Sequence, residues 1–74
     1  MEAKIKQIIA DVMEVPVESV QDSSSPDTIP SWDSLKHMNL ILALEQQLEI
    51  TFSEEQIAEM MSVELIVLTV KELL

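Results

Sequence analysis

Apolar residues recur every three or four positions near the start of the chain, which is the spacing of one helical face. The residues on this face are Ile5, Ile8, Ile9 and Val12. Pro16 has no amide donor, and it disfavours helical geometry at the residue before it. The pattern therefore predicts a first helix over about residues 2–14.

A second helix is predicted over about residues 34–49, with Asp33 and Ser34 as candidate N-caps. Its apolar side chains fall on two sides of the helix. One side holds Leu40, Ile41, Leu44 and Leu48, with His37 at its N-terminal end. The other is a stripe of Leu35, Met38 and Leu42. Two interpretations of this stripe are open. A short third helix covers part of it through Ile57, Met60 or Met61, or some of it stays exposed beside Ser34 as a docking surface for partner proteins.

The remaining two helices are predicted to begin at serine caps. The stretch SEEQ at residues 53–56 has the pattern of a capping box, which predicts a short helix over about 54–60. Ser62 can cap a last helix over about 63–74. The apolar residues on one face of that helix are Val63, Ile66, Val67, Val70 and Leu74.

A long loop is expected between the first and second helices. Two of the three prolines and four serines lie between residues 22 and 32, and the chain has no glycine. Loops of this length in a small domain are often functional. The elements together predict an all-α fold, a small four-helix bundle that forms a single domain over residues 1–74.

Charge narrows the kinds of partner that the protein can bind. Four lysines against fourteen carboxylates give a net charge of −10. Such a surface repels nucleic acid and anionic membranes and favours basic protein partners. The first residues lack the features of a signal peptide, and no apolar run is long enough to span a membrane. We therefore expect a cytoplasmic protein that neither binds nucleic acid nor inserts into a membrane.

The absence of cysteine limits the chemistry that the chain can perform alone. Disulfides and thiolate metal ligands are excluded, and the one histidine makes a zinc site improbable. His37 has no partner acid in the sequence, and its position predicts packing under the long loop rather than catalysis. We therefore assign no catalytic residue and no metal site.

Ser34 lies where the long loop meets the second helix. Unpaired amides and the helix dipole favour an anion at such a position, by about 0.3–1 kcal/mol. A phosphodiester on the serine hydroxyl is compatible with this field. Position alone, however, also fits an ordinary capping serine.

The wider pattern around Ser34 resembles the acyl carrier protein family. An Asp33-Ser34-Leu35 triplet opens the helix, which then reads LILALEQQL over residues 40–48 and so ends in a Leu-Glu pair and a large apolar residue. The resemblance covers the whole chain. Other positions that match the family are Ile8-Ile9, Val20, Phe52 and Ser62-Val63.

This resemblance implies a non-catalytic carrier, expected to be monomeric, with 4′-phosphopantetheine attached covalently to Ser34. Asp33 would support the motif by orienting the serine or cationic groups of the modifying enzyme. The partner-binding positions that it implies are Leu35, Met38, Leu42 and Glu45. The implied partners are a phosphopantetheinyl transferase, an acyl-loading enzyme, and a ketosynthase or acyltransferase. The arm's thiol would hold acyl groups as thioesters for fatty-acid, polyketide-like or related specialised biosynthesis.

Three residues near Ser34 depart from the family pattern. Ser31 stands where a glycine is common, and Trp32 follows it. We expect Trp32 to anchor the loop against the bundle, with an exposed partner contact as the alternative. Lys36 adds a positive charge to a helix on which the family usually carries several carboxylates. It should therefore disfavour strongly basic docking patches and favour dedicated partners.

Two other functions are compatible with the sequence. A peptidyl or aminoacyl carrier shares the arm, although its triplet often differs around the serine. An unmodified helical interaction module could dock a partner through the stripe of Leu35, Met38 and Leu42. Only the two kinds of carrier would bear an attached arm, so detecting an arm distinguishes them from this module.

Overall fold

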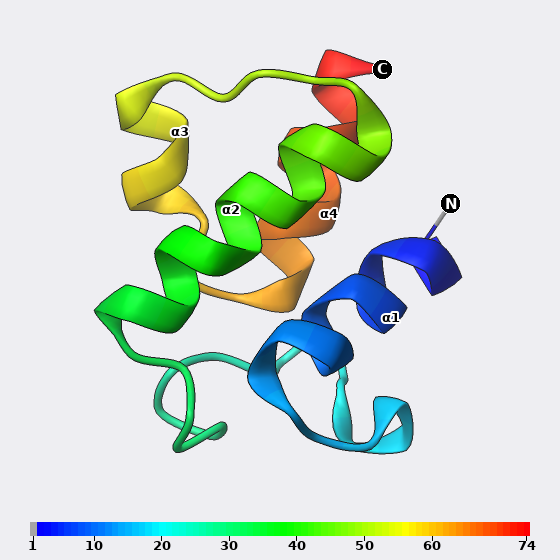
Figure 1. The fold of residues 1–74 in the computed structure, drawn as a ribbon, viewed down its shortest axis with the longest axis vertical. Helices are drawn as coiled ribbons and strands as arrows, with labels where there is room; N and C mark the ends of the chain where they lie inside the picture. The colour runs from blue at the N-terminus through cyan, green and yellow to red at the C-terminus, as the bar shows by residue number, and fades with distance from the viewer. Residues whose placement is uncertain (1) are drawn as a thin grey trace.

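The computed structural model describes residues 2–74, and this part of the chain forms four α-helices without any strand (Figure 1). The helices are α1 (Glu2–Met13), α2 (Ser34–Leu48), α3 (Glu54–Glu59) and α4 (Val63–Leu73). One 3₁₀ turn, η1 (Val17–Ser19), follows α1. The predicted all-α bundle is confirmed, and each predicted boundary lies within one residue of the observed one.

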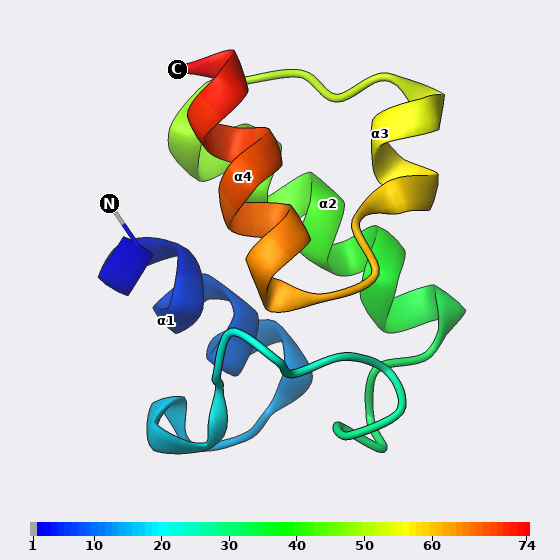
Figure 2. The ribbon, with the colours of Figure 1, turned by 180° about the vertical axis from the view of Figure 1, so that it is seen from behind.

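The helices are arranged around α2, which crosses the molecule on the near side of Figure 1. The view from behind shows α4 on the opposite side (Figure 2). α1 contacts both α2 and α4. α3 lies at the other side of the bundle from α1 in both views. α2 therefore has one face toward the core and one face toward solvent.

The core is mostly aliphatic and is built largely from the predicted helical faces, with Trp32 and Phe52 buried beside them. Met13 is fully buried, while Val12 is only partly buried. Leu74 follows the end of α4 and is exposed, which corrects its predicted place on the buried face. The principal buried side chains of the three longer helices are Ile5, Ile8, Ile9, Leu40, Ile41, Leu44, Val63, Ile66, Val67 and Val70.

Both α1 and α2 end on a glutamate in the left-handed region of backbone space. Glu14 has φ 59° and Glu49 has φ 56°. In each case the next amide donates back to a carbonyl of the last turn: Val15 N to Ala10 O at 3.1 Å, and Ile50 N to Glu45 O at 3.3 Å. Glycine is the usual residue at this position because it has no Cβ. The chain, which has no glycine, adopts the conformation with glutamate instead.

The long loop is held to the ends of two helices. Ser31 Oγ donates to Met13 O at the end of α1, at 2.8 Å. At the start of α4, Val63 N donates to Ser24 O at 2.9 Å and Glu64 N donates to Asp22 O at 3.0 Å. These contacts pair backbone groups that a helix leaves unpaired at its ends. The loop is therefore part of the bundle.

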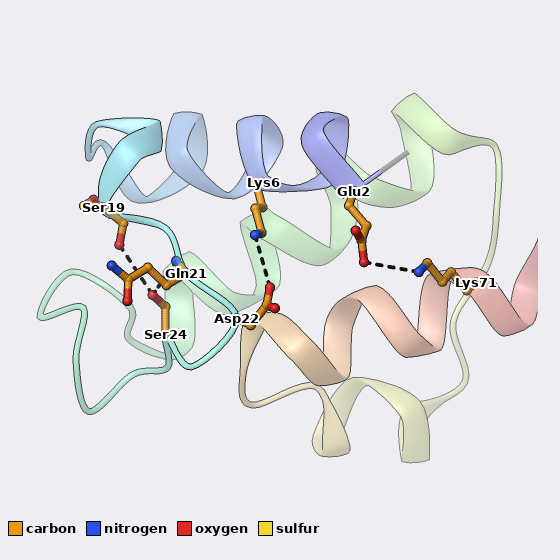
Figure 3. Close-up of polar contacts among 7 residues, drawn as sticks. All are labelled: Glu2, Lys6, Ser19, Gln21, Asp22, Ser24 and Lys71. Atoms are coloured by element: carbon orange, nitrogen blue, oxygen red, sulfur yellow. Dashed lines mark hydrogen bonds and ion pairs between the residues drawn. The ribbon is translucent and has the colours of Figure 1, made fainter.

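Polar side-chain contacts hold the long loop and α1 in place (Figure 3). The buried Ser24 hydroxyl accepts from Gln21 N at 2.9 Å. Lys6 pairs with Asp22, and Lys71 pairs with Glu2, each at 3.1 Å. The two ion pairs are exposed, so each stabilises the fold by about 1 kcal/mol or less. They join α1 to the loop and to α4.

Candidate functional site

Ser34 is the first residue of α2, and its side chain is exposed. The N-cap is Asp33, whose Oδ1 accepts from Lys36 N at 2.8 Å. Of the two candidate caps, Asp33 therefore takes this role. The Ser34 hydroxyl lies at the positive end of the α2 dipole, where an attached anion is stabilised.

An open pocket of about 440 Å³ lies beside Ser34. This volume is within the range of small-molecule sites. Most of its lining is apolar, and it comes from three parts of the chain: the long loop, the first turns of α2, and the connection between α3 and α4. The lining residues are Pro26, Trp32, Asp33, Ser34, His37, Met38 and Met61.

A chain of two hydrogen bonds joins the long loop, α2 and α3 beside this pocket. The Trp32 Nε1–H donates to His37 Nδ1 at 3.1 Å. His37 Nε2 lies 3.0 Å from the carbonyl oxygen of Ile57 in α3. Because Nδ1 accepts, the ring proton is assigned to Nε2, which donates to Ile57 O. We call these three groups the Trp32–His37–Ile57 bridge.

Burial confirms the anchoring role expected of Trp32. Its side chain is only 3% exposed, and its ring meets that of His37 edge to edge, with the centroids 6.2 Å apart and the ring planes 21° apart. A buried indole N–H needs an acceptor, which His37 provides. The prediction that His37 packs at the loop is also confirmed, since Trp32 is the last loop residue before the cap. The hydrogen bond from His37 to α3 was not predicted.

The second apolar stripe of α2 is exposed at its two outer positions. Leu35 is 70% exposed and Leu42 is 55% exposed. Met38 lies between them, is also exposed, and lines the pocket together with Met61. Within residues 2–74, no neighbouring helix therefore covers the stripe, although Met38 shares the pocket with Met61. Docking of partner proteins on the stripe stays a prediction.

Both charged residues of interest on α2 make contacts within the protein. Lys36 Nζ pairs with Glu14 Oε2 at 3.1 Å, which offsets its positive charge. The repulsion of basic partners expected from Lys36 is therefore weaker than the sequence indicates. Glu45 is half-buried, and its Oε2 accepts from Phe52 N at 3.0 Å. Its carboxylate thus holds the segment between α2 and α3.

Residues 2–74 contain no cluster of three or more His, Cys, Asp or Glu side chains that could hold a metal ion. Among the helices of this same range, none is long and apolar enough to cross a membrane.

Pro26 is a site residue that the sequence did not indicate, and Ile57 and Met61 were expected only as cover for the α2 stripe. Pro26 and Met61 line the pocket, and Ile57 contributes only a backbone oxygen. A signal was present for the bridge, because the single tryptophan and the single histidine lie five residues apart across a helix start. Nothing in the sequence marks Ile57 as their partner.

Comparisons with known proteins agree on one class. Residues 3–70 match the family described as phosphopantetheine attachment site. The chain is 33% identical over 64 residues to the acyl carrier protein of Buchnera aphidicola subsp. Schizaphis graminum, which covers 86% of this chain and 81% of that protein. The solution NMR structure of holo acyl carrier protein from Geobacter metallireducens superposes with a TM-score of 0.87. That match is 26% identical and covers 97% of this chain and 83% of the other.

The fold and the matched family define a phosphopantetheine-bearing carrier, in which 4′-phosphopantetheine is attached to a serine. The chain belongs to the acyl carrier protein family. Members of this family carry acyl groups between enzymes that modify them and enzymes that use their cargo, and are not themselves catalysts.

Proposed function

We propose that residues 1–74 act as one acyl carrier domain and that Ser34 is the serine that bears the arm. The choice of Ser34 rests on the hydrogen bonds that most of the other serine hydroxyls make. Of the eight serines, six have their hydroxyl oxygens in hydrogen bonds with the backbone. These six are Ser19, Ser24, Ser25, Ser31, Ser53 and Ser62.

The other two serines are Ser23 and Ser34, and both are exposed. Ser23 lies in a turn of the long loop, between residues whose carbonyls bind the start of α4. Ser34 lies at the start of a fifteen-residue helix and lines the pocket. Only Ser34 combines an accessible hydroxyl, a favourable field for a phosphate and a surface on which an arm can rest.

The residues around Ser34 fit the group. The first turn of α2 contains no acidic residue, and the carboxylate of the preceding Asp33 is bound to Lys36 N. The arm could lie along the pocket, against Met38 and Met61. When bound, the arm supplies the thiol that this cysteine-free chain lacks and that holds an acyl cargo as a thioester.

Attachment is a phosphoryl transfer onto Ser34. The serine Oγ forms a bond to the phosphorus next to the pantetheine portion of coenzyme A. The phosphoanhydride bond to that phosphorus breaks, and the bisphosphorylated adenosine portion leaves with the bonding electrons. The hydroxyl proton passes to a base of the phosphopantetheinyl transferase. On the carrier, Asp33 fixes the backbone of this turn by capping α2, so that the hydroxyl is presented at a defined position.

The exposed stripe of Leu35, Met38 and Leu42 is proposed as the face that enzymes contact. These enzymes are the transferase, an acyl-loading enzyme, and a ketosynthase or acyltransferase of fatty-acid, polyketide-like or related specialised biosynthesis. A partly exposed apolar face beside the attachment point suits repeated, reversible docking. Glu45, at the far end of this face, is proposed to act through its negative charge, because its carboxylate already binds Phe52 N.

Intact-mass spectrometry tests the assignment of Ser34. The apo protein is incubated with coenzyme A, magnesium and a promiscuous phosphopantetheinyl transferase. We expect the natural sequence and Ser23→Ala to gain one phosphopantetheine each, and Ser34→Ala to gain none. A natural sequence without any mass gain would contradict the carrier function. Equal gain by Ser34→Ala would contradict the choice of serine.

A further inference from the structure

The Trp32–His37–Ile57 bridge forms a wall of the pocket beside Ser34. Trp32 and His37 both line the pocket, and the bridge then continues to a carbonyl of α3. Ile57 O also accepts from Met60 N at 3.4 Å, so the bridge ends at the backbone turn that places Met60. Met60 is fully buried in the core. The bridge therefore connects the lining of the open pocket to the backbone beside a buried core residue.

The bridge also ties α3 to the first turn of α2. α3 has only six residues, and none of them is fully buried. A helix this short has little stability of its own, so its position depends on contacts made by its side chains and ends. Ile57 packs partly against the core, and the carbonyl of the same residue is held by His37. Breaking the bridge would free α3 to move away from α2.

Opening the bridge leaves polar groups unpaired inside the protein. The indole N–H of Trp32 is buried, and it would lose the acceptor His37 Nδ1. Unpaired buried donors are unfavourable, so the structure resists separation of α2 and α3 at this point. An apolar chain that enters from the pocket side meets this resistance before it reaches Met60 and Ile41, which are both buried.

We propose that Trp32 and His37 are specificity-determining residues, which limit the cargo sheltered beside Ser34 to short acyl groups. This inference rests on the proposed attachment of the arm to Ser34. A short acyl group fits in the pocket against Met38 and Met61 while the bridge is intact. A long aliphatic chain has no path into the core and stays in contact with solvent or with the partner enzyme.

The test compares two cargo lengths in proteins with and without the bridge. The natural sequence, His37→Ala and Trp32→Phe are loaded from butyryl- or dodecanoyl-coenzyme A by a promiscuous transferase, and loading is confirmed by mass. The five methionines give few, separable methyl NMR signals. Met38 and Met61 report on the pocket, and Met60 reports on the core. Asn39→Ala, an exposed neighbour on α2 outside the pocket lining, is the matched control.

We expect butyryl loading to shift the Met38 and Met61 methyl signals in every protein and to leave Met60 unchanged. In the natural sequence and in Asn39→Ala, dodecanoyl loading should still leave Met60 unchanged. In His37→Ala and Trp32→Phe, dodecanoyl loading should shift Met60, because the chain can now enter the core. His37→Gln, which offers both an acceptor and a donor, should restore the natural behaviour.

The natural sequence alone can overturn the inference, even if a variant does not fold. A dodecanoyl group that shifts Met60 and speeds hydrogen exchange of the Trp32 indole N–H would show that the bridge does not limit the cargo. Loaded protein with unmoved Met38 and Met61 signals would show that the pocket holds no cargo. Failure of loading itself, seen by mass, instead contradicts the proposed role of Ser34, so the two failures are distinguishable.

Discussion

At the scale of single residues, the notable positions are the helix ends, where backbone geometry restricts which residue fits. Two glutamates adopt positive φ at helix ends, where a Cβ costs about 1–2 kcal/mol relative to glycine. A neighbouring aspartate caps α2, which leaves the Ser34 hydroxyl exposed at the helix start. The sequence marks both Asp33 and Ser34 as candidate caps but does not show which of them caps α2. The two residues are adjacent and chemically equivalent as caps, and only backbone geometry separates them.

Replacing Glu49 by glycine should stabilise the protein. Relief of the left-handed strain outweighs the greater freedom of glycine in the unfolded chain, for a net gain of up to about 1 kcal/mol in the free energy of unfolding. Glu14→Gly should gain less, because Glu14 also pairs with Lys36. Urea denaturation of the two variants and the natural sequence measures both effects. A loss of stability in Glu49→Gly would contradict this account.

At the scale of elements, apolar periodicity predicted the three longer helices and nearly all of each buried face, and a capping box predicted α3. It worked because each of the three longer helices buries one stripe and begins or ends at a recognisable cap or proline. It could not predict the Trp32–His37–Ile57 bridge, whose last member contributes a backbone carbonyl with no sequence signal. Periodicity also could not predict that the charge of Lys36 is paired. Its partner Glu14 is far from it in the chain and meets it only after α1 and α2 pack.

The outer face of α2 should matter for docking more than an equally exposed face elsewhere. Leu42 on α2 is 55% exposed and Leu68 on α4 is 50% exposed, so the two form a matched pair. Leu42→Ala should lower kcat/KM for the transferase about five- to tenfold, the effect of losing about 1 kcal/mol at an interface. Leu68→Ala should change it less than about twofold. Steady-state rates at varied carrier concentration measure this, and equal effects would contradict the docking face.

At the scale of the whole molecule, most of the few positive charges lie in ion pairs, and carboxylates carry the excess negative charge. Three of the four lysines pair with carboxylates and join α1 or its end to the loop, α2 and α4. The net charge of −10 is therefore carried by carboxylates spread over a body of 26 × 23 × 19 Å. Such a surface attracts basic partners and also opposes its own compact state.

Added salt should therefore raise the thermal stability. At 0.01 M salt the Debye length is about 30 Å, so carboxylates repel one another across the whole molecule, whereas at 0.15 M it is about 8 Å. Screening also weakens the three exposed ion pairs, but each contributes little. Circular dichroism melting curves at the two salt concentrations should show a higher Tm at 0.15 M. A lower Tm there would mean that the ion pairs outweigh the self-repulsion.

The measurement that tests the central claim most directly is localisation of the arm by fragmentation mass spectrometry. The protein is produced in cells that contain a phosphopantetheinyl transferase, digested, and the fragment that spans residues 22–36 is sequenced. It holds five of the eight serines, Ser34 among them. We predict that all of the added phosphopantetheine mass lies on Ser34. Modification of Ser23 or Ser31 instead, or a fragment without any added mass, would contradict the account.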